Sequence, residues 1–283
     1  MEKGDQKESC GNCQRTFTNY STILLFFNQE HIAAECGNVE LCQHIMDKIE
    51  DKNPKDFFGE TPFHWAAEEG HYKVCKLILE KNIDKNPKNG RGVTPFHVAA
   101  SKGNLDLCKL IIQSAEDKNP ADNLGTTPLH RAARSGHNEI WKIIFEKVDD
   151  KDPVDCNGCT PLHYAAAMGQ FESCEIILEN VVNKNPSNNI GETPLQYAAF
   201  VGNFEIFKLI FQNVSEKNPM NNEGWTPLHV AASAGHFEIV KYIMERVNNK
   251  SPEDNVGCTP LDCAACSGHL DVCDLIESMT EDC

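Results

Sequence analysis

The sequence lacks long hydrophobic runs and is poor in basic side chains. Its longest strongly apolar run, Ile23 to Phe27, is far shorter than the roughly 20 residues that span a bilayer, so we expect no membrane insertion. Lys and Arg number 26 against 42 Asp and Glu, and the resulting net charge of −16 argues against a nucleic-acid or anionic-lipid surface. Met1 to Asp5 contain no apolar signal core. We therefore expect a cytoplasmic protein, with a nuclear location as the alternative.

Motifs that carry catalysis are also missing. No segment resembles a nucleophile elbow, a phosphate-binding glycine loop or a kinase signature. Of the 18 glycines, all except Gly4, Gly11 and Gly90 belong to the repeat pattern described next. The glycines of that pattern are therefore not free to form a nucleotide-binding loop. We expect no enzymatic activity and no cofactor.

What the sequence does contain is a strict 33-residue period, which all 14 prolines follow. Seven prolines are preceded by threonine, with a glycine two residues before that threonine, at Pro62, Pro95, Pro128, Pro161, Pro194, Pro227 and Pro260. The other seven are Pro54, Pro87, Pro120, Pro153, Pro186, Pro219 and Pro252. Such self-similarity indicates a repeat protein. It divides the chain into a polar tail (1–25), a degenerate first repeat (26–58), six regular repeats (59–256) and a shortened last repeat (257–283).

Each repeat has the signals of two helices. In repeat 59–91, Thr61 is suited to cap a helix start and Pro62 to occupy its first turn. Gly70 is placed to end this helix after about two turns. A second helix is predicted from His71 to Leu79, because its apolar residues fall on one helical face.

The pattern Gly-x-Thr-Pro-Leu-His-x-Ala-Ala-x-x-Gly-His, clearest in 125–137, 158–169 and 224–236, resembles the ankyrin repeat. The resemblance implies an all-α ankyrin-repeat solenoid of stacked helix–turn–helix units with projecting hairpin-like loops. Loops and first helices would form a concave side that binds proteins. One feature departs from the family, because the usual glycine after the second helix is replaced by Ile49, Asn82, Ala115, Val148, Val181, Val214 and Val247. Branched residues resist a left-handed backbone, so we predict a different helix end, with the Lys-Asn-Pro step making the turn.

Most histidines and cysteines also follow the period. Six histidines occupy the position after Thr-Pro-Leu or its equivalent, and the resemblance implies that they bond to the repeat's threonine and to loop backbone: His31, His64, His97, His130, His163 and His229. Five cysteines share one second-helix position that elsewhere holds Trp141, Phe207 or Val240: Cys42, Cys75, Cys108, Cys174 and Cys273. A position that accepts all of these residues is an apolar packing position.

The remaining cysteines include three Cys-x-x-Cys pairs, Cys10/Cys13, Cys156/Cys159 and Cys263/Cys266. A structural zinc site needs four ligands in one place, and the second and third pairs lie three repeats apart. We therefore predict no metal site. A metal- or redox-responsive protein that uses Cys10, Cys13 and Cys36 stays open as an alternative function.

The resemblance also implies where a partner binds, since the family's contact positions flank the loop glycine and precede the glycine after the first helix. In the middle repeats these positions hold Arg131, Arg134, Tyr164, Met168, Tyr197, Phe200, Val201 and Trp225. Aromatic residues, Met and Arg are enriched in protein interfaces. We predict that these residues bind a protein partner on a monomeric, non-catalytic scaffold or adaptor. Two alternatives remain: Tyr164 and Tyr197 pack between neighbouring repeats, or the chain is the targeting part of a larger assembly, such as a ubiquitin-ligase adaptor or a symbiont effector.

Overall fold

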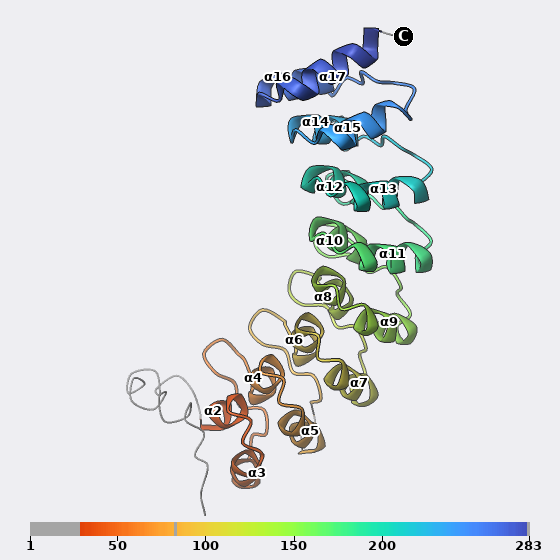
Figure 1. Cartoon of the computed structure of the whole chain (residues 1–283). Coiled ribbons are helices and arrows are strands. Elements are labelled where there is room, and N and C mark those ends of the chain that lie inside the picture. Colours follow the sequence, from red (N-terminus) through yellow and green to blue (C-terminus); the bar gives the residue numbers. More distant parts are fainter. Residues whose placement is uncertain (1–28, 82–83, 282–283) are drawn as a thin grey trace, which may run out of the picture. The chain divides into compact units, whose positions relative to one another are not determined.

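The computed structural model describes residues 29–81 and 84–281, which form helices joined by turns and loops, with no strand in these ranges (Figure 1). The predicted all-α repeat fold is confirmed. The chain divides into two compact units, one ending at Glu116 and the other beginning at Asp117. The first contains α2 (Gln29–Glu35), α3 (Val39–Lys48), α4 (Pro62–Glu68), α5 (Tyr72–Lys81), α6 (Pro95–Lys102) and α7 (Leu105–Ser114).

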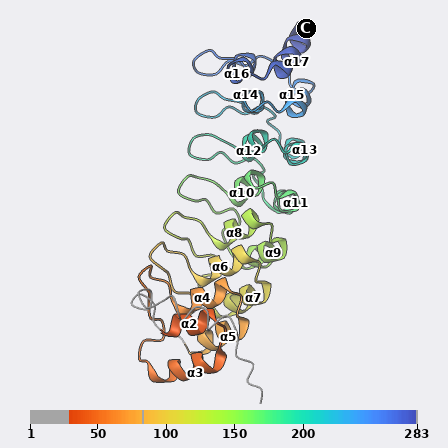
Figure 2. The ribbon, with the colours of Figure 1, turned by 60° about the vertical axis from the view of Figure 1, so that its left-hand side comes forward.

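The second unit contains five helix pairs. They are α8 (Pro128–Ser135) with α9 (Asn138–Lys147), α10 (Pro161–Ala167) with α11 (Phe171–Asn180), α12 (Pro194–Val201) with α13 (Phe204–Asn213), α14 (Pro227–Ser233) with α15 (Phe237–Met244), and α16 (Pro260–Ser267) with α17 (Leu270–Glu281). Within each unit, the first helix of a repeat contacts the first helix of the next, and second helices likewise contact one another. Figure 2 shows a loop projecting from the start of each first helix from α4 onward.

The start of each regular first helix follows the sequence signals. Before α10, Thr160 has the extended φ of −93° and ψ of 169° of an N-cap residue, and Pro161 takes the first helical position. The residue three positions after the threonine completes a reciprocal capping box, in this case His163. Gly202 ends α12 with a left-handed φ of 79°, a conformation that glycine adopts without steric cost.

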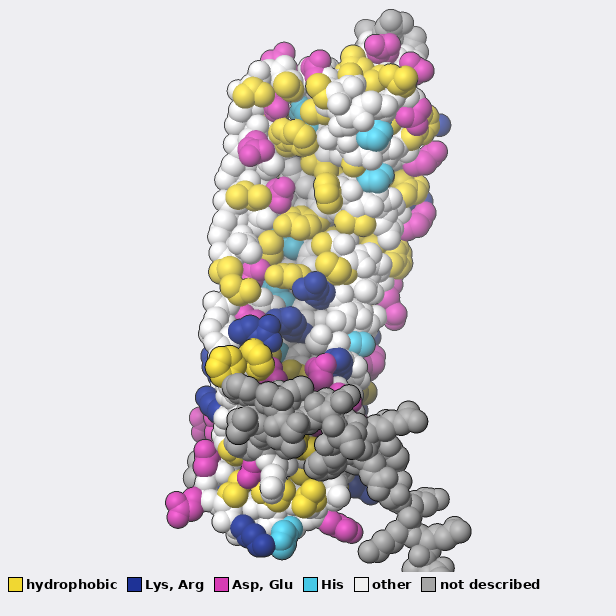
Figure 3. Space-filling view, turned by 90° about the vertical axis from the view of Figure 1, so that its left-hand side faces the viewer, with side chains coloured by type: hydrophobic (Ala, Val, Ile, Leu, Met, Phe, Trp, Pro, Cys, Tyr) yellow, Lys and Arg dark blue, Asp and Glu magenta, His cyan; other side chains and the backbone are white. Residues whose placement is uncertain are grey.

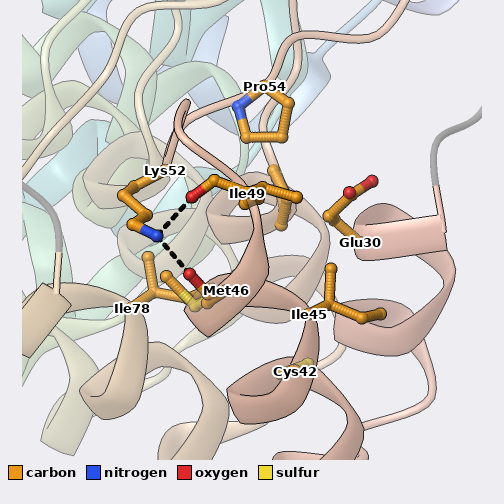
Figure 4. Close-up of a pocket in the computed structure, with 9 residues that line it drawn as sticks. Glu30, Cys42, Ile45, Met46, Ile49, Lys52, Pro54 and Ile78 are labelled. Carbon is orange, nitrogen blue, oxygen red and sulfur yellow. Dashed lines mark hydrogen bonds between the residues drawn. The ribbon is translucent and has the colours of Figure 1, made fainter.

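Second helices end in a different way, as predicted from the missing glycine. Val181, which follows α11, has an extended backbone with φ −90° and ψ 149°, and no described non-glycine residue has a positive φ. A lysine from the Lys-Asn-Pro step turns back to the exposed carbonyls instead. Figure 4 shows the ammonium of Lys52 donating to the carbonyl oxygens of Met46 and Ile49. A lysine at a helix C-terminus stabilises it both by hydrogen bonding and by its charge.

The next residue of this step, asparagine, serves the following helix. The Oδ1 atom of Asn185 accepts a hydrogen bond from the Leu195 N–H at 3.2 Å, near the start of α12. The corresponding bonds are made by Asn86, Asn119 and Asn218. Asp152 holds this position in one repeat, and burial together with repulsion from Asp150 raises its pKa to about 6. The prediction that the Lys-Asn-Pro step makes the turn is thus confirmed.

The core lies where helix pairs stack. The alanine pairs of the first helices α2 to α14 are buried, which lets neighbouring helices approach closely, as at Ala198 and Ala199. The predicted packing position is confirmed, because Cys174, Phe207 and Val240 are each 0% exposed. Burial raises the pKa of the Cys174 thiol to about 12, so this cysteine remains a protonated, apolar group at neutral pH.

None of the described helices is both long and apolar enough to cross a membrane.

Candidate functional site

The loops of the second unit are built by an acidic or amide side chain at the start of each turn. The Oδ1 atom of Asp155 accepts the N–H groups of Asn157 and Cys159 at 2.9 and 2.8 Å, which folds the chain into a tight hairpin-like turn. One main-chain bond then joins each loop to the next, as from the Asn189 N–H to the Asn157 carbonyl at 2.8 Å. The loops therefore present their side chains from a fixed scaffold.

Histidine side chains join the loops to the first helices. The Thr160 N–H donates to Nδ1 of His163 at 3.0 Å, while Nε2 of His163 lies 3.2 Å from the Glu192 carbonyl oxygen of the next repeat. Since a carbonyl can only accept, Nε2 carries the proton. Burial lowers the pKa of His163 to about 4, so it is neutral at pH 7. His64, His130 and His229 make the same bonds, which confirms the structural role implied for these histidines.

Gln196 replaces histidine in the repeat that begins at Gly191. Its Oε1 atom accepts the Thr193 N–H at 3.0 Å, and its Nε2 donates to the Trp225 carbonyl at 2.7 Å. The amide reproduces both bonds of the neutral histidine but does not titrate.

Two of the residues predicted to bind a partner are each held by an aspartate of the loop that precedes their helix. A guanidinium nitrogen of Arg131 donates to Oδ2 of the buried Asp122 at 3.0 Å. The Tyr164 hydroxyl donates to Oδ2 of Asp155 at 2.8 Å, and burial raises its pKa to about 12. The Tyr164 ring also meets His130 of the preceding repeat edge-on, with centroids 5.5 Å apart. These contacts fit the packing alternative for Tyr164.

Tyr197 and Trp225 are fixed in place but still reach the surface. The Tyr197 ring meets His163 edge-on at 5.4 Å, and its hydroxyl lies 3.4 Å from Nδ2 of Asn188. The indole nitrogen of Trp225 donates to Oδ2 of Asp254 at 3.1 Å. Both rings are half-buried. Their positions are therefore set before any partner arrives.

The remaining predicted residues are exposed. Phe200, near the end of α12, is 69% exposed, and the neighbouring Val201 and the more distant Met168 are 42% and 47% exposed. Arg134 lies exposed on α8. Figure 3 looks onto the side that carries the first helices, and hydrophobic side chains gather in its upper, C-terminal part with acidic groups among them.

A depression of about 430 Å³ lies between α12 and α14 and brings three of these predicted residues together, Tyr197, Phe200 and Trp225. Its other lining residues were not predicted from the sequence: Glu192, Gln196, Asn221, Glu223, Val230, Ser233 and Ala234. The structure does not bring Arg131, Arg134, Tyr164, Met168 or Val201 to this depression. Glu192 and Glu223 flank loop glycines, and this position is the signal by which they could have been found.

The depression is acidic. Glu192 and Glu223 line it, and neither carboxylate has a hydrogen bond or ion pair to the described residues. Lys and Arg are absent from its lining. Burial lowers the pKa of His229, whose ring stacks near Trp225 with centroids 6.1 Å apart, so this histidine adds no positive charge at pH 7.

The cysteine pairs do not assemble a metal site in the described ranges. Within residues 29–81 and 84–281 no group of three or more His, Cys, Asp or Glu side chains is placed to hold a metal ion. Cys156 and Cys266 are exposed, whereas their partners in sequence, Cys159 and Cys263, are buried. Cys36 is exposed, and the other two members of the proposed redox group, Cys10 and Cys13, lie outside the described residues.

Comparison with protein-family models matches the chain to ankyrin repeats (3 copies), over residues 30–89, 84–154, 147–221 and 195–282. A search of curated proteins finds no matching relative. The matched ranges include every helix from α3 to α17, and with them the whole depression between α12 and α14.

Proposed function

The chain belongs to the ankyrin repeat family, whose members are generally protein–protein interaction modules, and we propose that it is a non-catalytic scaffold or adaptor. It holds a protein partner on the face made by first helices and loops, centred on the depression between α12 and α14. The observation that carries this proposal is the group formed by Tyr197, Phe200 and Trp225 around that depression. Aromatic residues that are fixed beforehand lose little entropy on binding and are typical interface anchors.

The proposal extends to the setting in which the protein acts. It works as a monomer in the cytoplasm or nucleus, with a protein and not a nucleic acid or a lipid surface as partner. The net charge of −16 supports a monomer, because it keeps copies of the chain apart, and it argues against nucleic-acid and lipid partners, because it repels polyanions. Cysteine thiols buried in the packing position fit a reducing compartment.

The experiment compares proteins captured from the native cell by the wild-type chain and by a Phe200→Ala/Trp225→Ala variant. We expect the specific partner, identified by mass spectrometry, to be lost or strongly reduced with the variant. A Phe171→Ala/Val182→Ala variant is the matched control, because these apolar residues are also exposed but belong to α11 and the turn after it. Equal capture by all three folded proteins would refute the proposed binding face.

A further inference from the structure

The depression between α12 and α14 combines aromatic walls with unpaired carboxylates, and this combination points to the chemistry of its occupant. Tyr197, Phe200 and Trp225 supply the rings, and Glu192 and Glu223 supply the charge. The faces of aromatic rings attract cations, most strongly those of tryptophan. Carboxylates attract them by charge and by hydrogen bonding. A neutral apolar ligand would leave the two carboxylates without partners.

The segments that surround the depression are also free of positively charged Lys and Arg side chains. Residues 185–207, 218–240 and 251–281, which include the loops and first helices of its two repeats and the next, contain no Lys or Arg. The basic residues of these repeats lie on the second helices or in the turns that follow them, for example Lys241 and Lys217. Gln196 stands in the depression where other repeats have histidine, so that position carries no proton-dependent charge. A cation that approaches the depression therefore meets no basic side chain in these segments.

Trp225 is positioned before binding. Its main-chain N–H donates to Oδ1 of Asn221 at 2.8 Å, its carbonyl accepts from Gln196, and its indole N–H donates to Asp254. Three separate bonds thus hold the residue, and no bond to a ligand is needed to orient it. A ring held in this way suits stacking with a flat cation.

We propose that the depression binds an arginine side chain of a partner's basic, partly apolar peptide segment. This inference rests on the proposed function and names the partner chemistry at that site. The guanidinium group is flat, so it stacks on an aromatic ring while its N–H groups donate to carboxylates, which a lysine ammonium cannot do in the same way. Phe200 and Val201, exposed at the end of α12, would contact apolar residues next to the arginine.

A random 12-residue peptide library displayed on phage tests the proposal with the full chain as bait. Peptides that bind wild type but not Phe200→Ala/Trp225→Ala are sequenced. We expect arginine to be enriched in them beside apolar residues. Synthetic copies should bind at least about tenfold more weakly to a Glu192→Gln/Glu223→Gln variant, and when their arginine is replaced by glutamine. Replacing the arginine by lysine should weaken binding by a smaller factor.

The control for net charge is Glu172→Gln/Glu179→Gln, which changes two exposed carboxylates on α11 and should leave peptide affinity unchanged. Peptides that need the aromatic rings but bind equally to Glu192→Gln/Glu223→Gln would overturn the arginine site and leave the proposed binding face standing. A library that yields only peptides indifferent to Phe200→Ala/Trp225→Ala would overturn both. Enrichment of acidic or uncharged peptides would also refute the arginine site.

Discussion

Replacing His163 by glutamine should remove a defined part of the protein's sensitivity to acid. In the folded chain His163 is 1% exposed, its Nδ1 accepts the Thr160 N–H, and its Nε2 donates to a carbonyl. A second proton, on Nδ1, would therefore face the Thr160 N–H donor. Gln196 makes the same two bonds one repeat later, so His163→Gln should fold normally and change the free energy of unfolding at pH 7.5 by less than about 1 kcal/mol.

The size of the effect follows from the pKa of His163, which burial lowers from 6.5 to about 4. Because the unfolded chain binds the proton more tightly, the stabilisation is present above about pH 6.5 and is lost as the pH falls towards 4. One pKa unit corresponds to about 1.4 kcal/mol, so at pH 5 this histidine alone destabilises the fold by about 2 kcal/mol. His163→Gln should be more stable than wild type at pH 5 by about that amount.

The assay is urea unfolding followed by circular dichroism at pH 7.5 and pH 5. The reverse substitution, Gln196→His, is the matched control and should increase the loss of stability on acidification. If His163→Gln and wild type lose the same free energy between the two pH values, the neutral, buried histidine at this position is refuted.

Five further substitutions test the turns between repeats by the same unfolding assay. Asp152→Asn should stabilise the protein by about 1 kcal/mol at pH 7.5. The reason is that the partly exposed site disfavours the charge of the Asp152 carboxylate, as its raised pKa indicates. The gain should fade as the pH drops below about 6, because the carboxylate then becomes protonated. Lys217→Met should cost about 1 kcal/mol by leaving two helix-end carbonyls uncapped, whereas Lys184→Met, whose hydrogen bond goes to a side chain, should cost less than about 0.5 kcal/mol. Gly224→Ala should destabilise the protein by about 1–3 kcal/mol more than Gly257→Ala. Both glycines have left-handed φ values, +85° and +86°, so the backbone strain of an alanine is shared. At Gly224 alone of the two, an added Cβ would also lie 2.7 Å from a backbone nitrogen. Equal stabilities within any of these pairs, or no gain from Asp152→Asn, would contradict the contacts described.

The sequence predicts the helices well because their signals are local. Threonine, proline and the residue three positions after the threonine lie within one helical turn, and their capping bonds depend on little else, as at Thr160 and His163. The extended backbone after the second helix was also predictable, since Val181 resists the left-handed conformation. The atoms that replace the missing glycine cap were not predictable. Lys217 reaches back six residues to the Phe211 carbonyl, through a turn whose path the sequence does not specify.

The candidate site was predictable only in part, because stacking decides which side chains stay available. Tyr164 occupies a contact position of the family, yet its hydroxyl is bound by Asp155, nine residues earlier, which the loop brings back beside the helix. Glu192 lies just before α12 and Glu223 just before α14, and the two residues come to line one depression only when these helices stack. Repeat 191–223 alone lacks the part of the lining that Trp225 and Val230 supply from the next repeat.

Hydrogen exchange measured by mass spectrometry, with and without the captured partner, tests the central claim most directly. Binding through the first helices and loops predicts slower exchange in residues 188–201 and 221–234, which contain the lining of the depression, and unchanged exchange in α11 and α13. Protection confined to α11 and α13, with the loops and first helices unaffected, would contradict the account.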